Sequence, residues 1–195
     1  MSTRVLILGA HGQLARHTTE LLLRQTDAVL TLYLRRAKRL ANPDPERIRI
    51  VEGDVLDVET LVKAMQGQDV VYANLSGNMA AQARCIVQAM QTTGVKRLIF
   101  ISSMGIYGEI PNESYRSVLD PYRDSARVIE SSDLAYTILR PAWFTHVKEV
   151  NYQLTRKGQA FKGHEVSLDS LADLIMQLVL KPEQYVCESL GVSRV

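Results

Sequence analysis

Residues 5–15, VLILGAHGQLA, decide the fold class of this chain. Val5–Leu8 is wholly apolar, which is typical of a strand buried on both faces of a parallel sheet. Glycines at positions 9 and 12 allow a tight turn, and the amphipathic stretch Gln13–Arg24 that follows predicts a helix. A buried strand, a glycine turn and a helix in this order predict the first unit of a doubly wound parallel α/β sheet, the Rossmann fold.

The remaining sequence continues the alternation of strands and helices. Apolar runs predict further strands at 29–34, 48–51, 69–73, 97–101 and 136–139. Apolar periodicity predicts helices at 57–65, with Asp57 as N-cap, at 79–93, ended by Gly94, at 121–132 and at 168–180. Loops are predicted at 42–45 and 102–120, and a hairpin or extended pair at 150–161 around Lys157-Gly158. We expect one domain over residues 1–195, in which a small C-terminal extension, residues 141–195, contributes the substrate side.

Composition and charge exclude several classes of protein. With 46% hydrophobic and 23% charged residues, the chain has an ordinary globular composition. A net charge of +2 is too small to attract nucleic acid or a membrane surface, and no apolar run approaches the ~20 residues of a membrane span. The first residues lack the order of a signal peptide, and Cys85 and Cys187 lack metal-ligand spacing. We expect a cytoplasmic monomer or homodimer with no metal, no nucleic-acid partner and no membrane association.

The glycine turn has the spacing of a phosphate-binding loop, Gly9-x-x-Gly12-x-x-Ala15. Glycines let the backbone approach a pyrophosphate, and the first turn of the following helix supplies free N–H groups and partial positive charge. The alternative is a pair of turn glycines in an unrelated α/β protein, but the position after a buried strand favours a dinucleotide site. We expect cofactor contacts from Gly9, His11, Gly12, Gln13 and Leu14.

The end of the second predicted strand indicates which dinucleotide is bound. An NAD site normally places Asp or Glu there, about 20 residues beyond the glycines, to bind the ribose 2′-hydroxyl. This sequence has YLRR at 33–36 instead, and a guanidinium offers a 2′-phosphate a bidentate partner. Arg35 and Arg36 therefore favour NADP(H) over NAD(H), the alternative being a solvated basic turn. Lys38 and Arg39 fit either interpretation.

Three later stretches extend the pattern over nearly the whole chain: GDV at 53–55, VKRLIFISS at 95–103 and ESSDLAYTILRP at 130–141. Together with GAHG at 9–12, they resemble the atypical short-chain dehydrogenase/reductase superfamily. Within it, the chain is most similar to the small NAD(P)H-binding group that includes NmrA-like proteins and biliverdin reductase B-like flavin reductases.

The resemblance implies roles for residues at the carboxyl ends of the strands. Asp54 would bind the adenine amino group, unless it is only a cap or turn residue, and Val55 would pack on the ring. The ribose and pyrophosphate would lie beside Leu75, Ser76 and Gly77. Ser102 and Ser103 would face the nicotinamide and the substrate. The nicotinamide pocket would be lined by Pro141, Ala142, Trp143 and Phe144.

One departure from the superfamily concerns its catalytic Tyr-x-x-x-Lys pair, in which the lysine lowers the tyrosine pKa. Tyr122 takes the tyrosine position, but Ala126 stands at the lysine position. Arg127 follows it, turned away by ~100° around the helix. Tyr122 is therefore either a catalyst or a packing residue, and a typical alcohol dehydrogenase, epimerase or dehydratase is disfavoured.

Hydride transfer to a flat acceptor does not require that pair, since the protein then mainly binds and orients the reactants. Ser102, Ser103 and His146 could polarise or protonate such an acceptor, although a loop histidine is often only structural. Three aromatic residues could either stack on a planar ring or pack in the core or a loop: Tyr107, Tyr115 and Trp143. The sequence thus predicts an NADPH-dependent reductase of a small planar acceptor, such as a flavin or quinone. The alternative is a non-catalytic, NADP(H)-sensing regulator of the NmrA type.

Overall fold

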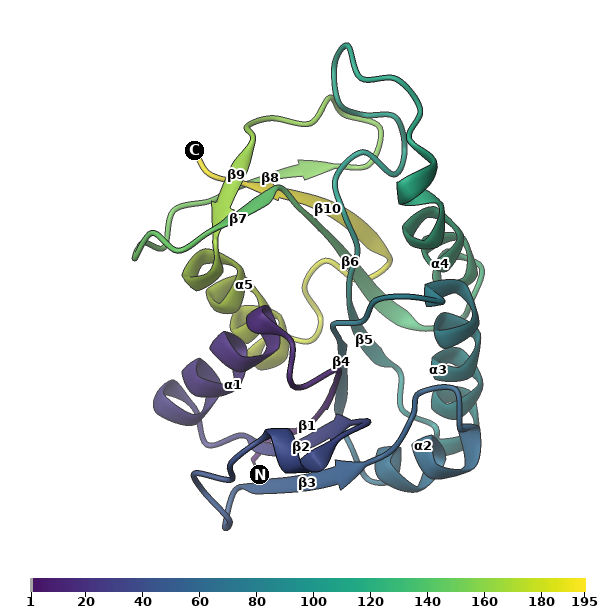
Figure 1. Cartoon of the computed structure of the whole chain (residues 1–195), viewed down its shortest axis with the longest axis vertical. Helices are drawn as coiled ribbons and strands as arrows, with labels where there is room; N and C mark the ends of the chain where they lie inside the picture. Colours follow the sequence, from purple (N-terminus) through teal and green to yellow (C-terminus); the bar gives the residue numbers. More distant parts are fainter. Residues whose placement is uncertain (1) are drawn as a thin grey trace.

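The computed structural model describes residues 2–195 and contains an eight-stranded sheet in the order β3-β2-β1-β4-β5-β6-β10-β8 (Figure 1). Its strands are β1 (Arg4–Leu8), β2 (Val29–Leu34), β3 (Ile48–Glu52), β4 (Val70–Ala73), β5 (Arg97–Ile101), β6 (Ala135–Pro141), β8 (Gln153–Arg156) and β10 (Glu188–Ser193). All neighbouring pairs are parallel except β10 with β8. The order reverses between β1 and β4, which is the switch point where doubly wound folds bind ligands.

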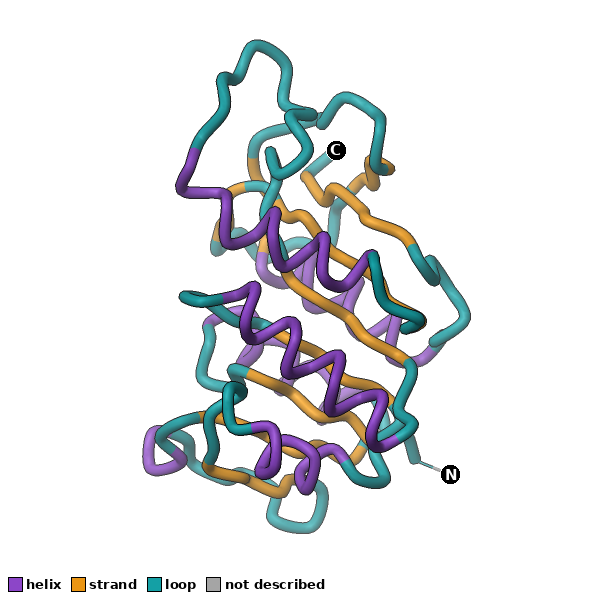
Figure 2. Tube along the Cα trace, turned by 90° about the vertical axis from the view of Figure 1, so that its right-hand side faces the viewer, coloured by secondary structure: helices purple, strands orange, loops and turns teal. Residues whose placement is uncertain are grey.

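Helices cover both faces of the sheet. One face carries α1 (Gln13–Gln25) and α5 (Leu168–Leu180). The other carries α2 (Val58–Met65), α3 (Met79–Thr93) and α4 (Asp120–Glu130), which lie side by side in Figure 2. Among residues 2–195, no helix combines the length and apolar character that crossing a membrane requires.

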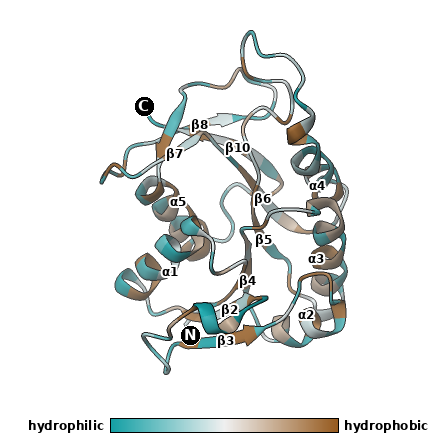
Figure 3. Ribbon diagram, viewed as in Figure 1, coloured by the Kyte–Doolittle hydropathy of each residue, from teal (hydrophilic) through white to brown (hydrophobic). Residues whose placement is uncertain are grey.

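Strand β1 shows how the sequence produces two cores. Its side chains alternate, so that Val5 and Ile7 join the core under α1 and α5, whereas Leu6 and Leu8 join the core under α2, α3 and α4. Figure 3 shows the same hydrophobic character along the central strands. Burial on both faces explains the uninterrupted apolar run that identified the fold.

Most predicted elements are confirmed. The predicted ranges for β2, β5, α3 and α5 coincide with the observed ones. Asp57 caps α2 by accepting a hydrogen bond from the Thr60 N–H at 3.2 Å, and Gly94 ends α3 with φ +78°. The fold class, a doubly wound parallel sheet in a single domain, is correct.

The predicted hairpin at 150–161 is wrong. Only β8 forms there, and its partner is β10, a strand not expected from the sequence. The residues after the Lys157-Gly158 turn do not return along β8, because the Phe161 N–H donates to the Glu109 carbonyl oxygen at 2.8 Å. The remaining C-terminal strands, β7 (Trp143–Thr145) and β9 (Glu165–Ser167), pair with each other in a separate small sheet.

Candidate nucleotide-binding site

The glycine loop lies at the carboxyl end of β1 and packs against the end of β4. Gly9 has φ +76°, and a Cβ atom on it would lie 2.1 Å from the backbone carbonyl oxygen of Asn74. The Gly9 N–H donates to the Tyr33 carbonyl oxygen at 3.0 Å, and the Gly12 N–H donates back to the Gly9 carbonyl oxygen at 2.9 Å. Only glycine satisfies both the backbone conformation and the close approach at position 9.

Helix α1 begins without a side-chain cap. Its N-cap is Gly12, and its first turn contains no acidic residue. By contrast α2, α3 and α5 are capped by side chains that accept an N–H hydrogen bond, those of Asp57, Asn78 and Ser167. The N–H groups and the positive dipole end of α1 are therefore available to an external anion.

A cavity of about 500 Å³ opens beside this helix start, between the loops that follow β1, β2, β3 and β4. It brings together most of the residues predicted to bind the cofactor: Gly9, His11, Gly12, Arg35, Arg36, Asp54, Val55, Leu75 and Ser76. Gln13, Leu14 and Gly77 are not part of its lining. Leu14 is a core residue on the buried face of α1.

The part of the cavity wall at the ends of β2 and β3 is built around one buried tyrosine, Tyr33. A Cβ atom at Gly53 would lie 2.2 Å from the Tyr33 hydroxyl, so this glycine lets the ring pack against the backbone. The Tyr33 hydroxyl donates to the Asp54 carbonyl oxygen at 2.9 Å. Burial, followed by the nearby Asp57 and Asp54 carboxylates, raises the pKa of Tyr33 to about 12, so it remains a neutral donor. Asp54 itself accepts from the Leu56 N–H at 3.0 Å, so this lining residue also stabilises a turn.

Three guanidinium groups form a basic rim around the cavity. Arg35, Arg36 and Arg39 all line it, and Asp54 is the single acidic residue of its described lining. Within residues 2–195, none of the three arginine side chains has an ion-pair or hydrogen-bond partner. The turn that presents Arg39, a 3-10 turn at Ala37–Arg39, is held by Glu52, whose carboxylate accepts from the Ala37 N–H at 2.7 Å.

The serines predicted to face the acceptor lie at the end of β5. The Ser102 N–H donates to the Leu139 carbonyl oxygen of β6 at 2.7 Å, which fixes the backbone. The Ser102 hydroxyl oxygen is buried and has no hydrogen-bond partner in the described part of the chain. The Ser103 hydroxyl instead donates to the Met104 carbonyl oxygen at 3.2 Å. Ser102 thus has the free hydroxyl of the two.

The residues predicted to surround the nicotinamide follow the end of β6. Pro141 is the last residue of β6, and the Ala142 N–H donates to the Val192 carbonyl oxygen at 2.9 Å. Trp143 begins β7 and is 64% exposed. The side chain of His146 lies next to the start of α1, where its Nε2 atom is 3.1 Å from the side-chain amide nitrogen of Gln13. None of these residues lines the 500 Å³ cavity, so their roles stay predictions.

The tyrosine position of the superfamily is occupied by a packing residue. Tyr122 is half-buried and packs on the core beneath α3 and α4. Ala126 is fully buried in the same core, where a lysine side chain would have no space. The catalytic role of Tyr122 stays a prediction, and the structure supports its packing role.

Sequence reasoning missed some residues of the site. Asn74 supplies the surface against which both glycines pack, with a Cβ atom at Gly12 reaching 2.4 Å from the Asn74 amide nitrogen. Lys38 and Arg39 were not missed but left between two interpretations, and of these Arg39 lines the cavity whereas Lys38 does not. No local pattern distinguishes Asn74 or Glu52 from other polar residues at strand ends.

Comparison with known proteins assigns this site to a family. The NAD(P)H-binding family matches residues 9–182. The chain belongs to the NAD(P)H-binding family. A Rossmann-fold NAD(P)-binding family protein from Shigella flexneri is 42% identical, with a TM-score of 0.90 over 100% of this chain and 94% of that one. A short-chain dehydrogenase/reductase from Veillonella parvula, solved in complex with NADP, is 29% identical, with a TM-score of 0.91 over 100% and 95% of the two chains.

Curated relatives of this NAD(P)H-binding protein include oxidoreductases. Quinone oxidoreductase 2 of Escherichia coli (strain K12) is 23% identical over 145 residues, 72% of this chain and 49% of the relative. The chain spans about half the length of the curated relatives it matches. The family match and the solved structures confirm both the NAD(P)H cofactor class and the resemblance to the atypical short-chain dehydrogenase/reductase group.

Proposed function

We propose that this chain is an NADPH-dependent oxidoreductase that reduces a small planar acceptor, such as a quinone or flavin, by direct hydride transfer. The observation that carries the cofactor preference is the basic rim, because Arg35, Arg36 and Arg39 line one cavity without partners among residues 2–195. A 2′-phosphate would supply the missing anion, whereas the 2′-hydroxyl of NAD(H) would leave these guanidinium groups unmatched. The NADP bound to the Veillonella protein supports the same choice.

The lining of the cavity supports a site for the adenosine and pyrophosphate part of a dinucleotide. The close approach of Gly9 to Asn74 and the uncapped start of α1 provide space and N–H donors for the pyrophosphate. Asp54 and Val55 would hold the adenine, and Leu75, Ser76 and Gly77 the adjoining ribose and pyrophosphate. Pro141, Ala142 and Trp143 would orient the nicotinamide end at the carboxyl edge of the sheet.

On the acceptor side, the chain itself contributes a hydrogen-bond donor rather than a strong acid. The bound nicotinamide supplies the hydride. The unpartnered Ser102 hydroxyl would donate to the oxygen or nitrogen on which negative charge develops, and solvent would complete the protonation. No lysine is needed for this chemistry, which agrees with Ala126 in the core. The name of quinone oxidoreductase 2 supports a quinone as one candidate acceptor.

We expect the purified protein to oxidise NADPH, and NADH more slowly, when menadione, FMN or riboflavin is supplied. Absorbance of the reduced nicotinamide measures the rate against an enzyme-free background. Background rates with all three acceptors would contradict the proposal. If NADPH and NADP⁺ then bind with clearly different affinities in titration calorimetry, the chain would be a sensor, the function that the buried Ala126 also permits.

Replacing Ser102 by alanine is expected to lower kcat at least about tenfold, because a positioned donor stabilises charge in the transition state. The Kd for NADPH should stay within about twofold of the wild type, since Ser102 does not line the 500 Å³ cavity. Steady-state kinetics with menadione and calorimetry measure the two quantities. Ser132→Ala, which removes a hydroxyl donating to Ile129 at the end of α4, serves as the control. Equal kcat values for S102A and the wild type would remove Ser102 from the reaction.

A further inference from the structure

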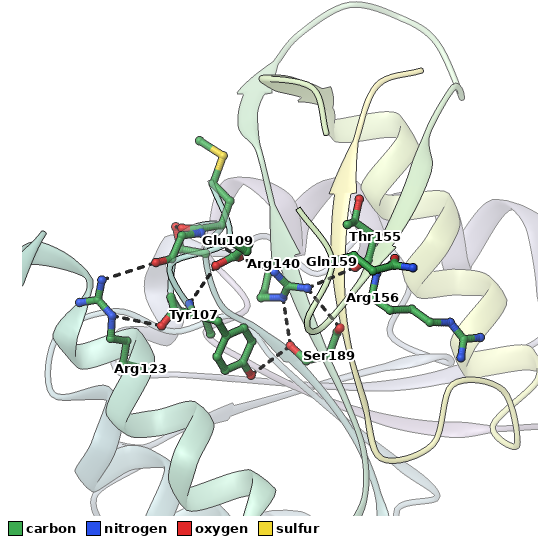
Figure 4. Close-up of polar contacts among 12 residues, drawn as sticks. Tyr107, Glu109, Arg123, Arg140, Thr155, Arg156, Gln159 and Ser189 are labelled. Carbon is green, nitrogen blue, oxygen red and sulfur yellow. Dashed lines mark hydrogen bonds and ion pairs between the residues drawn. The ribbon is translucent and has the colours of Figure 1, made fainter. Parts of the chain in front are cut away.

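The largest fully buried side chain among residues 2–195 is charged. Arg140 lies on β6 with 0% of its surface exposed. By strand alternation it shares a face of the sheet with Tyr136 and Ile138, which belong to the core under α2, α3 and α4. Its guanidinium forms an ion pair with Glu109, whose side chain is 4% exposed. The guanidinium also donates to the Ser189 hydroxyl at 3.1 Å and to the carbonyl oxygens of Thr155 and Ser189 at 3.2 and 3.3 Å (Figure 4). Arg140 thus joins β6, β10 and β8 to one carboxylate.

That carboxylate organises the loop that follows the two serines of β5. One oxygen of Glu109 accepts from the Gly105 N–H and the other from the Tyr107 N–H, both at 2.9 Å. The segment 104–109 contains no helix or strand, and the Glu109 contacts add to two backbone hydrogen bonds, from the Met104 N–H to Pro141 and from the Gly108 N–H to Gly105. Tyr107 is held as well, because the cationic groups of Arg140 and Lys157 lie 5.1 and 4.4 Å from the centroid of its ring.

The same loop is held from its other side by α4. Arg123 donates to the carbonyl oxygens of Ile106 at 3.1 Å and Gly105 at 3.4 Å. Glu109 therefore accepts hydrogen bonds from two N–H groups of the loop, and Arg123 donates to two of its carbonyl oxygens. Held in this way, the loop forms one wall of a second cavity, of about 470 Å³. This second cavity shares no lining residue with the 500 Å³ cavity.

We propose that Arg140 and Glu109 are positioning residues of the acceptor side: the buried pair fixes the loop 104–109 and, through it, Ser102 and Ser103. This inference rests on the proposed function, which places the acceptor beside those serines. A buried ion pair is weak support for stability, because apolar residues of similar volume often stabilise a core as well. Its two backbone hydrogen bonds to the loop give the pair a task that apolar side chains could not perform.

Three variants separate positioning from simple stabilisation. Glu109→Gln and Arg140→Met each leave one buried partner without its counterion, and both are expected to lower the melting temperature. The double variant E109Q/R140M removes both charges and should recover most of the melting temperature. It still lacks the carboxylate, because an amide offers one acceptor oxygen where the loop uses two. Asp133→Asn, which breaks the exposed Lys96–Asp133 pair, is the matched control.

We expect the double variant to show backbone hydrogen exchange in residues 104–109 at least about tenfold faster than the wild type. Its KM for menadione should rise about tenfold, while its Kd for NADPH stays within about twofold. Wild-type loop exchange in the stable double variant would overturn the proposal, and so would faster exchange with an unchanged KM. If the wild type turns over no acceptor, the proposed function fails, whereas loop exchange still decides whether the pair fixes the loop. Should the double variant fail to fold, Glu109→Asp measured in the same way replaces it, with wild-type loop exchange in E109D again counting against the proposal.

Discussion

Arg35→Asp weakens the binding of NADPH about 100-fold and changes the binding of NADH by less than about threefold: this is the result that the basic rim leads us to expect. The substitution removes a charge-assisted contact and brings a carboxylate towards the 2′-phosphate. A loss of about 2.7 kcal/mol, which corresponds to about 100-fold, is within the range for hydrogen bonds to charged groups plus repulsion. NADH lacks that phosphate, so it has no comparable interaction to lose. Titration calorimetry with both dinucleotides at one ionic strength measures the difference.

Lys38→Asp is the matched control for this experiment. It makes the same change of charge in the same turn, but Lys38 does not line the cavity. It should therefore weaken NADPH binding only through the general field, by a few-fold, and more salt should reduce the effect. Equal losses for NADPH and NADH in Arg35→Asp, or equal effects of the two variants, would refute a 2′-phosphate contact at Arg35.

Gly9→Ala is expected to abolish tight binding of both dinucleotides and to lower the free energy of unfolding by at least about 2 kcal/mol. The residue has φ +76°, and its new Cβ atom would approach the Asn74 carbonyl oxygen to 2.1 Å. That oxygen belongs to the backbone at the end of β4, so it cannot swing away as a side chain could. Urea denaturation measures the stability, and calorimetry measures the affinity.

The control is Gly158→Ala, in a turn with φ +88° and no atom within 4 Å of the added Cβ. This variant has the cost of the left-handed backbone alone. Any additional loss in Gly9→Ala then reports the close approach of the glycine loop to β4. A Gly9→Ala protein with wild-type stability and affinity would mean that the loop rearranges freely.

The first half of the fold was predictable because its signals are local. The apolar run of β1, the glycines after it and the Asp57 cap each specify their own few residues. The lining of the candidate cofactor cavity shares this property, since Arg35 and Asp54 each follow a strand whose end meets the others at one edge of the sheet. Family resemblance added roles for such positions without changing their location.

The second half depends on contacts between distant segments. β10 contains Ser189, Gly191 and Ser193, which do not form an apolar run. Arg140 packs against Ser189, and Phe161 packs against Gly191. A Cβ atom at Gly191 would lie 2.7 Å from the Phe161 ring, so this glycine matches a residue 30 positions earlier. The pairing of Arg140 with Glu109 is similarly long-range. Sequence periodicity cannot detect such pairs, because neither member breaks its local pattern in a distinctive way.

The missing cap on α1 links the lifetime of the protein to its ligand supply. A glycine N-cap costs a helix a few tenths of a kcal/mol relative to a good capping side chain, and the bare Gly12 leaves the N–H groups of α1 to whatever anion binds. A ligand at a hundredfold excess over its Kd adds about 2.7 kcal/mol to the folded state. Depletion of the dinucleotide would therefore increase the unfolded fraction roughly 100-fold, and proteases would remove the chain faster when its ligand is scarce.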